Sequence, residues 1–92
     1  MPQTANDIKS MLVSTYAKSF AARHIDPSQV DDRFDLFTGG IIDSLGIMEM
    51  IAMVEESIGR QIDFDEMEAD DLTRIGPFCR FVASKAAEEQ VA

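Results

Sequence analysis

The sequence contains little of the chemistry that disulfides and metal sites require. It has one cysteine, one histidine and no tryptophan among its 92 residues. A single cysteine cannot form a disulfide within the chain, which is typical of proteins in a reducing compartment. One cysteine and one histidine also fall short of the four ligands that a structural zinc site uses. We therefore expect a cytoplasmic protein without a metal site.

Positive charge is also scarce. The chain has eight lysine and arginine residues against seventeen aspartate and glutamate residues, a formal net charge of −9. A nucleic-acid-binding domain needs a basic patch, so we expect no nucleic-acid partner. Residues 43–71 contain ten acidic residues and a single basic one. This concentration of negative charge predicts a partner whose docking face is positively charged.

Long apolar segments are absent as well. No apolar run approaches the roughly 18 residues of a membrane span, and the N-terminal residues show no basic region followed by an apolar one, as an export signal would. We therefore expect no membrane partner. Leucine, isoleucine, valine and phenylalanine make up 24 of the 92 residues, enough for a modest core. The length predicts a single domain over residues 1–92, with its core at about 5–87.

The spacing of apolar residues predicts an all-α fold. Thr4 and Asp7 resemble a capping box, and apolar residues at helical spacing continue from there to about Arg23. Residues 24–42 are then a long connection that contains turn-forming residues. Three residues of this connection are too apolar for a free loop, and we expect them to fold back on the core: Phe34, Leu36 and Phe37.

Three further helices are predicted after this connection. The second helix runs from about Ser44 to Ile58, and Gly59 ends it. A short acidic helix follows at about residues 65–70. The last helix begins near Thr73 and accommodates Pro77 because the proline lies in or near its first turn. Its inward side chains are expected to be Ile75, Phe78, Val82 and Ala86, with Cys79 at the edge of the core.

The second helix has two apolar faces. One forms a stripe that must face the core: Ile47, Met50, Ile51, Val54 and Ile58. Nearly opposite lies a second strip, made of Leu45, Met48 and Ala52, which is flanked by Glu49, Glu55 and Glu56. A small bundle has no second core for this strip, so we interpret it as a docking surface for a partner. The alternative is that residues 24–42 or the third helix cover it.

Asp43 and Ser44 stand at the start of this helix, where either residue is a good cap. A hydrolytic serine is not indicated. The nucleophile-elbow motif requires glycine two residues before the serine, where this chain has Ile42, and the only histidine is His24, in a turn region. An EF-hand loop beginning at Asp63 would also fail at three of its required positions. The sequence therefore predicts neither a serine enzyme nor an EF-hand; for the acidic stretch it leaves open weak, unspecific binding of divalent cations.

The segment Gly40-Ile41-Ile42-Asp43-Ser44-Leu45, together with the residues after it, resembles the acyl carrier proteins and peptidyl carrier domains. The later residues that carry the likeness are Glu49, Met50, Val54, Glu55 and Glu56. The resemblance covers about residues 8–86. It implies an acyl-carrier-protein-like four-helix bundle with three longer helices and one short helix.

The resemblance also implies a function. Ser44 would be the attachment point of 4′-phosphopantetheine, with Asp43 beside it, and a separate phosphopantetheinyl transferase would transfer the group from coenzyme A. The thiol of this arm would hold an acyl or aminoacyl group as a thioester. The protein itself would not be an enzyme. Its partner-binding residues would be Leu45, Met48, Glu49, Ala52, Glu55 and Glu56.

Gly46 departs from the pattern of fatty-acid-synthesis carriers, which usually have an acidic residue at this position. The chain therefore looks more like a stand-alone, monomeric carrier of a secondary or specialised pathway. We expect an adenylate-forming ligase to load it, with an amino acid favoured over a fatty acyl group, and downstream acyl-transferring enzymes to unload it. The alternative function is an unmodified acidic helical adaptor that binds a basic partner surface.

Overall fold

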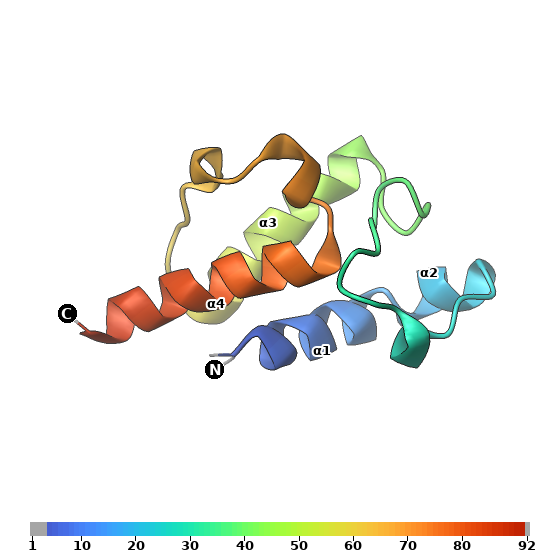
Figure 1. Ribbon diagram of the computed structural model, residues 1–92, viewed down its shortest axis with the longest axis horizontal. Coiled ribbons are helices and arrows are strands. Elements are labelled where there is room, and N and C mark those ends of the chain that lie inside the picture. The colour runs from blue at the N-terminus through green and yellow to red at the C-terminus, as the bar shows by residue number, and fades with distance from the viewer. Residues whose placement is uncertain (1–3, 92) are drawn as a thin grey trace.

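The computed structural model describes residues 4–91, and this part of the chain is all-helical (Figure 1). Residues 1–3 and 92, which belong to the predicted domain, lie outside the described residues. The α-helices are α1 (Ala5–Thr15), α2 (Ala17–Ala22), α3 (Ser44–Ile58) and α4 (Ile75–Val91). The 3₁₀ helices are η1 (Pro27–Gln29), η2 (Phe64–Glu66) and η3 (Ala69–Asp71). The predicted all-α class is confirmed.

Helices α1 and α4 lie side by side and run in opposite directions, while α3 crosses them at an angle (Figure 1). Residues 24–42 pass around the end of the molecule where α4 begins, and residues 59–74 lead from the end of α3 back to that same end. Sixteen buried apolar residues form one core between these segments. They are Ile8, Leu12, Phe20, Val30, Leu36, Ile41, Ile42, Met50, Val54, Ile58, Ile62, Ile75, Phe78, Cys79, Val82 and Ala86.

The residues at the ends of the helices cap or terminate them as predicted. Thr4 accepts a hydrogen bond from the Asp7 N–H, and the Asp7 carboxylate accepts one from the Thr4 N–H, so the capping box is present. Gly59 ends α3 in the left-handed conformation, with φ 77°, which glycine adopts without a steric penalty. Pro77 is the third residue of α4. The predicted bounds of the second helix are confirmed at both ends.

The predicted first helix is wrong in one respect, because it is interrupted at Tyr16, where φ is −102° and ψ is 19°. An uninterrupted helix would rotate Phe20 by about 120° relative to Ile8, since each residue turns by about 100°. Phe20 is nevertheless fully buried and lies 6.0 Å from the ring of Phe34. The change of direction at Tyr16 therefore returns α2 to the core.

Two other predictions need correction. The acidic stretch at 65–70 is not an α-helix but belongs to the two short 3₁₀ helices η2 and η3, which are separated by Met67 and Glu68, both in an extended conformation. Its four neighbouring carboxylates repel one another, which disfavours a continuous helix. In the connection, Leu36 is buried and Phe34 half-buried as expected, whereas Phe37 is 43% exposed. Phe37 lies in a tight turn, where Asp35 accepts a hydrogen bond from its N–H.

The connection covers the start of α4. The N–H groups of Ile75 and Gly76 donate to the carbonyls of Phe34 and Asp32, at 2.9 and 3.0 Å. The two segments approach so closely that a Cβ at Gly76 would lie 2.5 Å from the Cβ of Asp32. Since Pro77 has no N–H, every donor in the first three positions of α4 is accounted for.

Among residues 4–91, no helix is both long and apolar enough to cross a membrane.

Candidate functional site

Ser44 is the first residue of α3, and its side chain is exposed to solvent. The preceding Asp43 is the N-cap of the helix, where its carboxylate accepts a hydrogen bond of 2.6 Å from the Gly46 N–H. No residue in the described range forms a hydrogen bond with the Ser44 hydroxyl. The hydroxyl is therefore accessible to another protein.

The chain before Ser44 is held firmly by the core. Ile41 and Ile42 are buried, and the N–H groups of both donate to the Leu36 carbonyl, at 2.9 and 3.1 Å. Gly40 precedes them with φ 81°, and a Cβ there would lie 2.8 Å from Cζ of Arg23. Burial of two consecutive isoleucines thus fixes where α3 begins and, with it, where Ser44 is presented.

The start of α3 favours negative charge. The N–H groups of the first turn of a helix have no partner within the helix, and the helix dipole places partial positive charge there. The Asp43 carboxylate accepts a hydrogen bond from the Gly46 N–H. The N–H groups of Ser44 and Leu45 have no acceptor among residues 4–91. A phosphate group on Ser44 would lie beside these two donors.

The predicted docking strip is exposed. Leu45 and Met48 are 68% and 64% exposed, and Ala52 is exposed on the same face. Neither residues 24–42 nor η2 and η3 cover the strip, so the alternative that it is internal is wrong. The uncovered side chains of Leu45 and Met48 lie one helical turn apart, so together they form an exposed apolar surface next to Ser44.

The three glutamates beside the strip differ from one another. Glu49 and Glu56 are exposed. The pKa of the Tyr16 hydroxyl is raised, first by its burial and second by the negative charge of Glu49. Glu55 is half-buried, and its Oε2 accepts a hydrogen bond of 2.8 Å from the N–H of Ile62. Glu55 therefore holds the chain that leaves α3, and one of its carboxylate oxygens is already engaged there.

Sequence reasoning missed one exposed apolar side chain near this surface. Phe37 belongs to the turn that precedes Ser44, and this turn lies beside the start of α3 (Figure 1). The glycine pair at 39–40 was a usable signal, because it predicts a tight turn whose outer residues point to solvent.

Among the described residues, no three histidine, cysteine, aspartate or glutamate side chains gather closely enough to hold a metal ion.

Comparisons with protein-family models, with characterised proteins and with solved structures give no significant match to this chain.

Proposed function

We propose that the chain is a carrier protein that bears 4′-phosphopantetheine on Ser44. The observation that carries the proposal is the exposed Ser44 hydroxyl at the start of α3, directly beside the uncovered side chains of Leu45 and Met48. A transferase must reach both the hydroxyl and a docking surface, and here the two are adjacent. The likeness of the segment around Asp43 to acyl carrier proteins supports the same assignment.

The residues present are suited to the prosthetic group. Its phosphodiester would be negatively charged, and the unpaired N–H groups of Ser44 and Leu45 would stabilise that charge. When bound, the group supplies a thiol that forms a thioester with an acyl or aminoacyl cargo. Asp43 keeps the first turn of α3 in place by capping it. The transferase supplies the base and the metal, because this chain offers Ser44 only as an acceptor.

The docking surface favours partners with a basic, partly apolar face. Leu45, Met48 and Ala52 would fill an apolar recess, and Glu49 and Glu56 would pair with lysine or arginine side chains around it. The proposed partners are the transferase, an adenylate-forming ligase that loads the carrier, and downstream acyl-transferring enzymes. In this proposal the protein is a cytoplasmic, monomeric, non-catalytic member of the acyl-carrier-like four-helix bundles, from a specialised pathway.

Intact-mass spectrometry after incubation with coenzyme A and a phosphopantetheinyl transferase tests the proposal. The wild type should gain one phosphopantetheine group, and Ser44→Ala should gain none because the accepting hydroxyl is removed. Ser10→Ala is the matched control, since Ser10 is an exposed serine on α1, and it should be modified like the wild type. An unmodified wild type, or an adduct that persists on Ser44→Ala, would contradict the proposal.

The adaptor alternative uses the same surface without modification. If the chain is a carrier, Met48→Glu should slow the transfer of phosphopantetheine to Ser44 by at least about tenfold, because a charge replaces an apolar contact. Ala21→Glu adds the same charge at an exposed site on α2 and should leave the rate of transfer unchanged. The adaptor instead predicts that Ser44→Ala retains partner binding and full function, whereas Met48→Glu abolishes both.

A further inference from the structure

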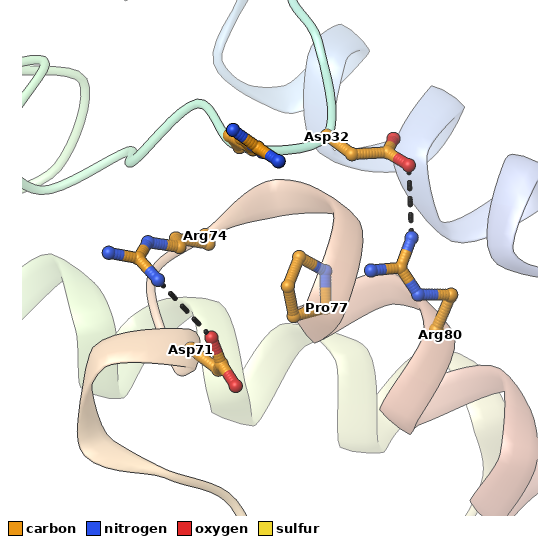
Figure 2. Close-up of a pocket in the computed structure, with 6 residues that line it drawn as sticks. Asp32, Asp71, Arg74, Pro77 and Arg80 are labelled. Atoms are coloured by element: carbon orange, nitrogen blue, oxygen red, sulfur yellow. Dashed lines mark hydrogen bonds and ion pairs between the residues drawn. The ribbon is translucent and has the colours of Figure 1, made fainter.

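A second cluster of charged side chains lies where the connection meets the start of α4, and no residue of α3 belongs to it. It lines a groove of about 600 Å³, formed by Asp32, Arg33, Asp71, Arg74, Pro77 and Arg80. Figure 2 shows its two ion pairs, with Pro77 between them. Three of the eight basic residues in the whole chain meet in this groove. In a protein of net charge −9, such a convergence of arginines indicates a site for an anion.

The arginines of the groove can be re-paired easily. The guanidinium of Arg80 lies 3.0 Å from the Asp32 carboxylate, and that of Arg74 lies 3.5 Å from Asp71. All four side chains are between 37% and 62% exposed, and exposed ion pairs contribute little to stability. The Arg33 guanidinium has no acidic partner among residues 4–87, whose side chains the structure describes. A guanidinium binds a phosphate group through two parallel hydrogen bonds, so a multiply charged phosphate can displace a single exposed carboxylate.

The surroundings of the groove limit the anion to a compact one. An adjoining hollow shares Asp71 and Arg80 with the groove and adds Glu66 and Glu68. An extended acidic chain that followed the groove would meet these carboxylates and be repelled. The start of α4 contributes no donors either, because the connection already accepts hydrogen bonds from the N–H groups of its first two residues. Binding therefore depends on the three arginine side chains.

We propose that Arg33, Arg74 and Arg80 form a binding site for the diphosphate group of a small molecule. The site does not depend on Ser44, so its test is separate from that of the carrier proposal. The full chain is titrated with inorganic pyrophosphate at constant ionic strength and followed by backbone amide chemical shifts. Shift changes are expected at residues 31–34 and 71–81, and not along α3.

Arg33→Ala is the most informative variant, because it breaks no ion pair of the described structure. It should weaken pyrophosphate binding by at least about tenfold, since a charge-assisted pair of hydrogen bonds is lost. Lys18→Ala removes the same charge at an exposed site on α2 and should leave the affinity unchanged. A nucleoside diphosphate is the second probe: tighter binding than pyrophosphate assigns the site to nucleotides, and equal binding assigns it to the diphosphate group alone.

Three results would overturn the proposal. Equal weakening by Arg33→Ala and Lys18→Ala would show a general charge effect. Shift changes of the same size with sodium chloride would show that the groove does not recognise phosphate. A phosphoserine peptide that binds more tightly than pyrophosphate would assign the groove to a protein partner in place of a small molecule.

Discussion

The two longest helices, α3 and α4, begin in opposite ways. The cap of α3 is local, because Asp43 caps the helix and leaves the Ser44 side chain exposed. The cap of α4 is distant in sequence, since the carbonyls of Asp32 and Phe34 accept hydrogen bonds from the first two N–H groups of the helix. The third residue, Pro77, has no N–H. A helix start capped by its own neighbours stays accessible to another protein. One capped by a remote segment becomes part of the core.

The apolar residues repeat this contrast. In the first turns of α4, Ile75 and Phe78 are completely buried. In the first turns of α3, Leu45 and Met48 are more than 60% exposed. Burial of such side chains is a main source of stability, so α3 forgoes stabilisation at this end while α4 does not. The start of α3 therefore leaves apolar side chains in solvent, whereas the start of α4 buries them.

Thiol reactivity gives the largest expected difference between the two helices. Burial raises the pKa of the Cys79 thiol on α4 to about 12, so almost no reactive thiolate is present at pH 8. In Ser44→Cys, the new thiol at the exposed start of α3 should react with iodoacetamide on the order of a thousand times faster than Cys79. Mass spectrometry of the two cysteine-containing peptides after digestion measures the labelling rates of both thiols in the same protein.

The unfolded Ser44→Cys protein in guanidinium is the control, where both thiols should react alike. Similar rates for the two thiols in the native protein would contradict the difference in accessibility.

Glycine substitutions test the two helix starts directly. Gly76→Ala should lower the free energy of unfolding by about 2–3 kcal/mol, because its Cβ would clash with Asp32 and separate the connection from α4. Gly46→Ala should change the free energy of unfolding by less than about 1 kcal/mol. Its Cβ would lie in a tight contact, 3.1 Å from Cβ of Ile42, and the higher helix preference of alanine should offset that cost. Urea unfolding measures both. Equal losses would show that the start of α3 is as tightly packed as that of α4.

The smallest expected effect is a loss of stability at alkaline pH. The pKa of Cys79 rises from its ordinary 9.0 to about 12 on folding, so between these values the folded protein binds more protons than the unfolded one. Stability is therefore retained below pH 9 and falls as the pH rises, by about 1 kcal/mol at pH 10. Unfolding of the wild type and of Cys79→Ala at pH 8 and pH 10 measures this loss. It should be smaller in Cys79→Ala, and an equal loss would contradict the assignment to this thiol.

The features that the sequence predicted correctly depend on residues close together along the chain. The capping box at Thr4, the stop at Gly59 and the bounds of α3 are set by contacts across one helical turn. The second apolar strip on α3 followed from helical periodicity, which also depends on neighbouring residues. The attachment of phosphopantetheine remains a prediction, since it concerns chemistry that another enzyme performs.

Only the tertiary structure decided the rest, because it depends on residues that are distant in sequence. The break at Tyr16 arises from the packing of Phe20 against Phe34, and the hydrogen bond from Ile62 makes Glu55 a structural residue. The close approach of the connection to α4 determines which helix start is covered and brings the arginines of the groove together. A pattern along the chain specifies which face of a helix is apolar. Which segments cover that face is decided by how all the helices share one small core.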